Sequence, residues 1–420
     1  MKLPNIELLR FITAGSVDDG KSTLIGRLLH DSKSIFEDQL SAIETTTRKR
    51  GLSGVDLSLL TDGLQAEREQ GITIDVAYRY FATPKRKFII ADTPGHEQYT
   101  RNMVTGASTA NLAIILIDAR KGVLTQTRRH AYLASLVGIP HLVVAVNKMD
   151  LVGYSREVFD SIVEEFGRFA SNLGLSNIIP IPISALEGDM VVERGENMPW
   201  FRGETLLGVL ENIEIDHDIN LEDFRFPVQW VCRPQSEQWH DFRGYMGRIE
   251  SGTISVGDEV TVLPSGRTTR VREINTYDGT LVEAVAPQSV TLLLEDEVDI
   301  SRGDMIVKSG NLPDLSREGE AMLCWLSEEP LDMRRKYLVK HTTKTAKILL
   351  NRLDFRVDVN TLETEEGISS LAMNDIAKIG FKVQSPLAAD DYRKNHATGS
   401  FIVIDEATNN TVAAGMLMQG

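Results

Sequence analysis

The sequence predicts an α/β domain with a doubly wound, mostly parallel sheet, followed by two antiparallel β-barrel domains. In the first half of the chain, short apolar runs alternate with amphipathic helical patterns. From about residue 226 onward, short alternating segments are instead broken by Gly and Asp. The chain has 420 residues, which is too long for one ordinary core, so two or three domains are expected.

The N-terminal half contains five near-continuous apolar runs, which is the pattern of parallel strands covered on both faces. These runs are Leu9–Ala14, Phe88–Ala91, Leu112–Ile117, Leu142–Val146 and Ile178–Ile183. The segment Ile72–Phe81 alternates apolar and polar residues, which predicts a strand with one face more exposed to solvent. Helical patterns over Gln126–Val137 and Arg156–Leu173 complete the expected sheet and its covering helices.

The C-terminal half predicts two small β domains, because short strand patterns are separated by turn signals. The strands expected in the first are Val228–Cys232, Tyr245–Ile249, Glu259–Leu263, Val271–Ile274 and Val290–Leu294. Those expected in the second are Ala321–Leu326, Lys336–His341, Thr345–Asn351, Ala377–Val383 and Ser400–Ile404. The acidic stretch Asp216–Asp223 predicts a linker, so we expect domains at 1–217, 218–312 and 313–420.

Composition excludes several classes of protein. Hydrophobic residues make up 42% and charged residues 25%, which is typical of a globular protein, and no apolar run reaches the roughly 20 residues that span a bilayer. Cys232 and Cys324 lie outside any CxxC or Cys/His cluster, so they are expected to be reduced thiols. A net charge of −15 argues against broad affinity for nucleic acid. We therefore expect a cytoplasmic protein with no membrane or nucleic-acid partner.

Residues 15–22 match the phosphate-binding loop pattern G-x-x-x-x-G-K-[ST]. The loop follows the expected strand that ends at Ala14 and opens a helical pattern, which is the context that this motif requires. Glycines let backbone N–H groups close around phosphate oxygens, and the helix N-terminus favours the negative charge. We expect Lys21 to contact the β- and γ-phosphates and Ser22 to bind Mg²⁺. The residues predicted to contact nucleotide here are Gly15, Ser16, Val17, Asp18, Asp19, Gly20, Lys21, Ser22 and Thr23.

Asp18 and Asp19 place two carboxylates beside the expected triphosphate, where they would repel it unless a cation intervenes. Both side chains could simply point to solvent. The alternative hypothesis is that Asp18 helps to hold a monovalent or divalent cation near the phosphates.

The second motif, Asp-Thr-Pro-Gly, directly follows the expected strand Phe88–Ala91. Its Asp lies at the carboxyl end of a strand and can reach Mg²⁺, and its Gly can offer a backbone N–H to the γ-phosphate. The Thr in Gly71–Ile74 can complete the coordination of Mg²⁺ when GTP is bound, although an ordinary strand Thr is an equal alternative. The predicted contact residues are Asp92, Thr93, Pro94, Gly95 and His96, and the predicted Mg²⁺ ligands are Ser22, Thr73 and Asp92.

His96 follows the Asp-Thr-Pro-Gly motif directly and is expected to orient the attacking water beside the γ-phosphate. An ordinary loop or core histidine is the alternative. The residues predicted to serve catalysis are Lys21, Thr73, Gly95 and His96.

A third motif, Asn-Lys-Met-Asp, follows the expected strand Leu142–Val146 and predicts a guanine reader. Asp150 can accept hydrogen bonds from guanine N1–H and the exocyclic amine, a donor pair that adenine lacks. We expect Asn147 to brace the loop, the stem of Lys148 to lie over the ring, and a backbone N–H after Ile183 to read guanine O6. The predicted contacts are Asn147, Lys148, Met149, Asp150, Ser184, Ala185 and Leu186. Together the motifs predict an α/β P-loop GTPase domain.

These motifs, followed by two β domains, resemble the translational GTPases over the whole chain. Gly257–Val260 reads Gly-Asp-x-Val and resembles a segment of their second domain. Their phosphate loop usually reads G-H-V-D-H-G-K-T, whereas Ser16 and Asp19 replace both histidines here. Two longer segments, Leu59–Phe81 and Asp92–Ala110, closely resemble the GTPase subunit of bacterial sulfate adenylyltransferase, also called ATP sulfurylase.

This resemblance implies a role in sulfate assimilation and cysteine biosynthesis, within a hetero-oligomer. A separate catalytic sulfate adenylyltransferase subunit would join ATP and sulfate into adenosine 5′-phosphosulfate and pyrophosphate, while this chain couples GTP hydrolysis to that uphill reaction. Such coupling needs a switch, and residues 31–75 and 92–110 are its candidates.

Two further expectations follow from the resemblance. Some family members carry a fused adenylylsulfate kinase, which would need a second phosphate loop, and none follows Ser22. Two interpretations stay open: a subunit without the kinase, or part of a longer chain. An elongation-factor-like GTPase that carries aminoacyl-tRNA is the alternative function, which the altered phosphate loop disfavours.

Overall fold

The computed structural model describes residues 7–33, 75–94, 99–173, 175, 177–215, 220–233 and 242–419. The chain divides into two compact units. They are Met1–Ile215 with Val359–Thr361, and Asp216–Asp358 with Leu362–Gly420. Across the described ranges, no helix is both long enough and apolar enough to cross a membrane.

The first unit contains a six-stranded sheet in the order β2-β3-β1-β4-β5-β6, in which only β2 runs antiparallel to its neighbour. Its strands are β1 (Leu8–Ala14), β2 (Ala77–Ala82), β3 (Lys87–Asp92), β4 (Leu112–Asp118), β5 (His141–Asn147) and β6 (Ile178–Pro182). Its described helices are α1 (Lys21–Asp31), α4 (Thr100–Ala107), α5 (Thr125–Leu136), η3 (Met149–Val152), α6 (Arg156–Asn172) and α7 (Leu206–Asn212). The predicted doubly wound domain is confirmed.

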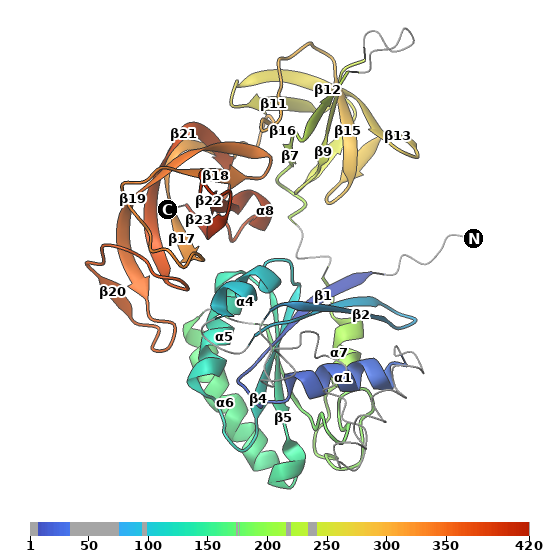
Figure 1. The fold of residues 1–420 in the computed structure, drawn as a ribbon. Helices are drawn as coiled ribbons and strands as arrows, with labels where there is room; N and C mark the ends of the chain where they lie inside the picture. Colours follow the sequence, from blue (N-terminus) through green and yellow to red (C-terminus); the bar gives the residue numbers. More distant parts are fainter. Residues whose placement is uncertain are drawn as a thin grey trace. The chain divides into compact units, whose positions relative to one another are not determined.

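Helices cover both faces of this sheet. Figure 1 shows α4, α5 and α6 on one side of it and α1 and α7 on the other. The central strands β4 and β5 are therefore buried at every position, which explains their continuous apolar sequence. Parallel strands end at one edge of the sheet, so the loops after β1, β3, β4 and β5 meet there.

The second unit consists of two antiparallel β-barrel domains, as the sequence predicts. The first is built from β7 (Arg225–Pro227), β8 (Trp230–Cys232), β9 (Gly244–Arg248), β10 (Thr253–Ser255), β11 (Glu259–Leu263), β12 (Arg267–Thr276), β13 (Gly279–Leu281), β14 (Glu283–Val285), β15 (Ser289–Leu294) and β16 (Met305–Lys308). The second is built from β17 (Asp314–Trp325), β18 (Tyr337–His341), β19 (Lys344–Val357), β20 (Thr364–Glu366), β21 (Ile376–Ala389), α8 (His396–Gly399), β22 (Ser400–Ile404) and β23 (Thr411–Met418). In the second barrel β18 pairs with both β19 and β22, which closes the ring.

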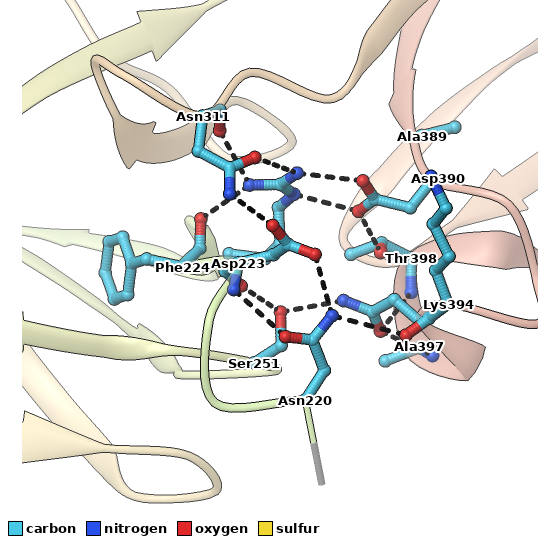
Figure 2. A network of polar contacts seen from close by, with 12 residues as sticks. Asn220, Asp223, Phe224, Ser251, Asn311, Ala389, Asp390, Lys394, Ala397 and Thr398 are labelled. Carbon is cyan, nitrogen blue, oxygen red and sulfur yellow. Dashed lines mark hydrogen bonds and ion pairs between the residues drawn. The ribbon is translucent and has the colours of Figure 1, made fainter.

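A buried polar network joins the two barrels within this unit (Figure 2). Arg225 of the first barrel is 1% exposed, and its Nε and one terminal nitrogen donate to both carboxylate oxygens of Asp390 in the second barrel, each over 2.8 Å. Its other terminal nitrogen donates to the carbonyls of Phe224 and Asn311, over 3.0 and 2.9 Å. The hydroxyl of Thr398 donates to the same carboxylate over 2.6 Å. Every hydrogen-bonding nitrogen of this buried guanidinium therefore has an acceptor.

Several predicted strands differ in extent from the observed ones, and two of them show a local cause. Of the segment expected as Val228–Cys232, only Trp230–Cys232 is a strand, β8. Val228 and Gln229 lie between β7 and β8, where the N–H of Val228 donates to the carbonyl of Asp304 and the N–H of Gln229 donates to that of Met246. The chain thus passes from one neighbouring strand to another. Of the strand expected at Ile72–Phe81, residues 72–74 lie outside the described residues. Strand β2 begins at Ala77, and before it the carboxylate of Asp75 accepts the N–H of Val76 over 2.7 Å. The domain limits after residues 217 and 312 stay predictions.

Candidate nucleotide-binding site

The phosphate loop lies between β1 and α1, as predicted, and its lysine is folded onto the loop. Lys21 Nζ donates to the carbonyls of Gly15 and Ser16 over 2.8 and 3.1 Å. The side chain is buried, and burial lowers the pKa of its ammonium although the carboxylates of Asp92 and Asp19 oppose this effect. A phosphate group entering the loop would offer this ammonium a stronger acceptor than the carbonyls.

The two residues that replace the histidines of translation factors contact each other. The N–H of Ser16 donates to Asp19 Oδ2 over 2.6 Å, and the N–H of Asp19 donates to the carbonyl of Ser16 over 3.2 Å. Asp19 is 1% exposed, and burial raises its pKa to about 6, against the opposing effects of the Ser16 N–H and Lys21. Asp19 therefore braces the loop from within. Asp18 is exposed and adopts a left-handed backbone conformation with φ of 67°.

The buried Asp19 carboxylate predicts a pH-dependent stability. Its pKa is about 6 in the folded chain and near its ordinary value of 3.8 in the unfolded chain, so the folded state holds the proton more tightly. The stability that this bound proton contributes to the wild type is therefore lost as pH rises from about 4 through 6. The variant Asp19→Asn lacks this loss, so its stability relative to wild type should rise by on the order of 1 kcal/mol between pH 5 and pH 7.5. Urea denaturation at both pH values measures the difference.

The matched control for that experiment is Asp18→Asn, which removes an exposed carboxylate from the same loop. We expect its stability difference from wild type to be the same at both pH values. An Asp19→Asn difference that also stays constant would contradict a buried, proton-binding Asp19.

Gly20 is required at its position by both its backbone and its surroundings. It has φ of 93°, and an added Cβ would lie 2.5 Å from Nδ2 of Asn147. That amide donates to the carbonyl of Asp19 over 2.7 Å and so ties the phosphate loop to the end of β5. A side chain at residue 20 would displace the Asn147 amide and break this hydrogen bond.

We therefore expect Gly20→Ala to weaken GDP binding at least tenfold, as measured by calorimetric titration. Gly257→Ala is the matched control, because Gly257 has φ of 90° but an added Cβ would meet nothing within 4 Å. Both variants carry a similar backbone strain of about 1–2 kcal/mol, and only Gly20→Ala adds the clash. Equal GDP affinity in the two variants would contradict this role for the Asn147 tie.

Asp92 ends β3 at the same edge of the sheet and is buried. The hydroxyl of Thr13 donates to its Oδ1 over 3.1 Å, and the hydroxyl of Thr93 donates to the carbonyl of Thr13 over 2.7 Å. These contacts fix the start of the Asp-Thr-Pro-Gly motif against β1. Asp92 and Ser22 supply a carboxylate and a hydroxyl, which are the oxygen ligands that Mg²⁺ prefers. Thr73, Gly95 and His96 lie outside the described residues, as does much of the two candidate switch segments.

The residues predicted to read guanine lie close together. Asn147 Oδ1 accepts the N–H of Ala185 over 2.9 Å, so Asn147 holds both the phosphate loop and the loop after β6. The hydroxyl of Ser184 donates to Asp150 Oδ1 over 2.6 Å and orients this carboxylate. Met149 is fully buried beneath them. Leu186 is 62% exposed, and an exposed leucine beside the reader offers an apolar surface to a planar base.

Sequence reasoning missed the residues that hold Lys148. Asp118 ends β4, is 1% exposed and forms ion pairs with Lys148 over 3.1 Å and Arg120 over 2.7 Å. Burial alone would raise the pKa of Asp118, but hydrogen bonds from Arg120 and Lys148 hold it below its usual range. Lys148 Nζ also donates to the carbonyl of Asp18. A polar residue directly after the run Leu112–Ile117 was the available sequence signal.

Comparison with known proteins also indicates a GTP-binding domain in the first part of the chain. The family model of the elongation factor Tu GTP binding domain matches residues 6–279, and that of the GTP-eEF1A C-terminal domain matches residues 318–418. These matches imply that the first domain binds a guanine nucleotide.

Relatives match almost the whole chain. Sulfate adenylyltransferase subunit 1 of Alteromonas mediterranea is 59% identical over 98% of this chain and 87% of its own length. The protein of the same name from Bacteroides fragilis is 56% identical over 98% of this chain and 86% of its own length. The bifunctional enzyme CysN/CysC of Mycobacterium tuberculosis is 55% identical over 98% of this chain and 67% of its own length. The chain therefore belongs to the sulfate adenylyltransferase subunit 1 family and carries an elongation factor Tu-type GTP-binding domain.

Proposed function

We propose that this chain is the GTP-hydrolysing subunit of sulfate adenylyltransferase. It would couple GTP hydrolysis to the formation of adenosine 5′-phosphosulfate and pyrophosphate from ATP and sulfate. The observation that carries the proposal is a phosphate loop tied by Asn147 to a guanine-reading loop, in a chain 59% identical to a protein of that name. The two cysteines are free thiols, which supports a cytoplasmic location.

Different residues would bind the phosphates, the Mg²⁺ ion and the base. The loop from Gly15 to Thr23 would hold the phosphates, with Lys21 released from its carbonyl contacts to bind the β- and γ-phosphates. Ser22 and Asp92 would hold Mg²⁺ together with Thr73. Asp150 would pair with guanine N1–H and the exocyclic amine.

Catalysis would depend on stabilising charge at the γ-phosphate. Mg²⁺ supplies a positive charge that neutralises the triphosphate when it is bound. We propose that the N–H of Gly95 contacts the γ-phosphate and that His96 orients the attacking water. The variant His96→Ala should keep its affinity for GTP and lose most of its hydrolysis, and unchanged hydrolysis would remove His96 from the mechanism.

A monovalent cation near Asp18 is a further part of the proposal. The side chain of Asp18 is exposed and its carbonyl accepts from Lys148, so the carboxylate stays accessible beside the loop. Hydrolysis rates in K⁺, Na⁺ and choline salts, for wild type and Asp18→Ala, test this cation. A wild type that is indifferent to all three salts would exclude it.

The partner that we propose is the catalytic subunit of the adenylyltransferase. Coupling requires that the GTP and GDP states of this chain bind that subunit with different free energies. We place the switch in residues 31–75 and 92–110.

The decisive experiment mixes this chain with the catalytic subunit. GTP hydrolysis should rise when ATP and sulfate are added together and not when either is added alone, and product should accumulate beyond its GTP-free equilibrium. Unstimulated hydrolysis, alongside a gel shift of aminoacyl-tRNA in the presence of GTP, would overturn the proposal in favour of a translation-factor function.

A further inference from the structure

A side-chain clamp joins the two segments that carry the guanine reader. The hydroxyl of Tyr154 donates to Asp189 Oδ2 over 3.1 Å, and the amide of Asn197 donates to both oxygens of Asp189 over 3.2 and 3.0 Å. Tyr154 comes shortly after Asp150, and Asp189 comes shortly after Ser184. The nucleotide contacts proposed above involve none of these three clamp residues.

The Tyr154 side of the clamp is fixed to the helical turn η3 that contains Asp150. The N–H of Tyr154 donates to the carbonyl of Met149 over 2.8 Å, and the indole N–H of Trp200 donates to the carbonyl of Tyr154 over 3.0 Å. Tyr154 adopts the left-handed conformation with φ of 57°, and its hydroxyl reaches Asp189 in the loop after β6. A shift of Tyr154 would therefore move the end of η3 with it.

The Asp189 side of the clamp is fixed to Ser184. The N–H of Ser184 donates to the carbonyl of Asp189 over 3.1 Å, and the N–H of Gly188 donates to the carbonyl of Ser184 over 2.7 Å. Because the hydroxyl of Ser184 in turn donates to Asp150, the contacts form a closed ring. The ring runs from Asp150 through Ser184, Asp189 and Tyr154 back to η3.

The clamp is packed too tightly to be a chance surface contact. Asp189 is 7% exposed, and an added Cβ on Gly195 would lie 1.9 Å from its Oδ1. Gly195 has φ of 67°, so only glycine fits there on both counts. Burial and the hydrogen bond to Asp189 raise the pKa of Tyr154 to about 12, so its hydroxyl stays a donor at neutral pH.

We propose that Tyr154 and Asp189 are positioning residues that hold the Asp150 carboxylate in register with the guanine edge. The inference deepens the proposed function, since it presumes that the site binds guanine nucleotides. Two hydrogen bonds from one base edge to one carboxylate tolerate little displacement, so a clamp on both supporting segments sharpens base selection. Asn197 supports the clamp by donating its amide to both carboxylate oxygens of Asp189.

The test compares GDP with inosine diphosphate, whose base lacks the exocyclic amine. A displaced Asp150 loses the paired contact to guanine and keeps much of the single contact to hypoxanthine. For Tyr154→Phe and for Asp189→Asn we expect GDP affinity to fall about 5- to 20-fold and inosine diphosphate affinity to fall less than about 3-fold. The preference for GDP should therefore fall in both variants, measured by displacement of a fluorescent nucleotide from the chain alone.

Tyr132→Phe is the matched control, because Tyr132 is a partly buried tyrosine of α5 that the clamp does not include. It should leave the preference for GDP unchanged. The double variant Tyr154→Phe/Asp189→Asn should lose less preference than the product of the single losses, because both substitutions break the same contact.

A clamp with a purely structural role would give a different result. The variants would then unfold at lower temperature while both nucleotides lose affinity equally, and this outcome would overturn the inference. Tyr154→Phe deletes one hydroxyl, and Asn197→Ala gives a second variant if Asp189→Asn fails to fold. Failure of the coupling assay with the catalytic subunit would contradict the proposed function and leave a selective loss of GDP affinity intact.

Discussion

Replacing Arg225 with Ala is expected to lower the free energy of unfolding of the β-barrel unit by about 3–5 kcal/mol. The guanidinium is 1% exposed and binds Asp390 through two hydrogen bonds of 2.8 Å. Its removal would leave the Asp390 carboxylate in the interface between the barrels with only the hydroxyl of Thr398 as a side-chain donor. Urea denaturation followed by tryptophan fluorescence measures the change, since Trp325 is buried in the core of the second barrel.

The matched control is Arg334→Ala. The Arg334 side chain is 94% exposed and lies 3.5 Å from Asp332, so it forms an ion pair in water rather than in a protein interior. This variant should keep the wild-type denaturation midpoint, because exposed pairs contribute little. A loss below 1 kcal/mol for Arg225→Ala would show that water or another donor replaces the guanidinium.

The double replacement of Arg225 by Met and Asp390 by Leu separates the two contributions. Neither charge would then be buried alone, and well-packed apolar pairs often match buried ion pairs in stability. We expect the double variant to recover most of the loss caused by Arg225→Ala. That result would show that each buried charge needs the other as a partner, and that an apolar interface between the barrels would be about as stable.

The parts of the site that could be predicted are those written contiguously in the sequence. The phosphate loop and the Asn-Lys-Met-Asp motif each combine unusual residue types at fixed spacing after an apolar strand. The structure confirms that Asn147 joins them, with its amide on the carbonyl of Asp19 and its oxygen on the N–H of Ala185. The parallel topology explains this success, since strand ends meet at one edge of the sheet.

The contacts that could not be predicted join residues that are distant in sequence and ordinary in type. Arg225 and Asp390 are 165 positions apart, and neither belongs to a motif. Tyr154 and Asp189 are 35 positions apart. Tyr154, and Gly195 beside Asp189, both have left-handed backbone conformations, which side-chain patterns do not reveal.

Strand β23 is one of several strands that the sequence did not predict, and the physical reason is different. Strand β23 is Thr411–Met418 and contains Ala413, Ala414 and Gly415, which have low strand propensity. It is nevertheless paired on both sides, by β17 and β22. Phe401 explains the glycine, because an added Cβ on Gly415 would lie 2.2 Å from that ring. Tertiary packing therefore selected residues that local propensity disfavours.

Replacing Asp150 with Asn is expected to change the base that the site selects. If Asp150 pairs with guanine as we propose, the variant would lose two charge-assisted hydrogen bonds and would place an amide donor opposite a donor, so GDP affinity should fall at least about 100-fold. Xanthine carries a carbonyl where guanine carries its exocyclic amine, and an amide donor suits that carbonyl. We therefore expect xanthosine diphosphate to bind the variant better than GDP does, measured by displacement of a fluorescent xanthine nucleotide.

The contact with Ser184 should determine how tightly Asp150→Asn binds xanthosine diphosphate. Its hydroxyl donates to Asp150 Oδ1 over 2.6 Å, and the carbonyl oxygen of the introduced asparagine can accept the same bond. The amide nitrogen would then be directed to the base and not away from it. Adding Ser184→Ala removes this direction, so the double variant should lose much of its affinity for xanthosine diphosphate while Asp150→Asn alone retains it. Equal affinity in the two variants would show that the base, and not Ser184, orients the residue at position 150.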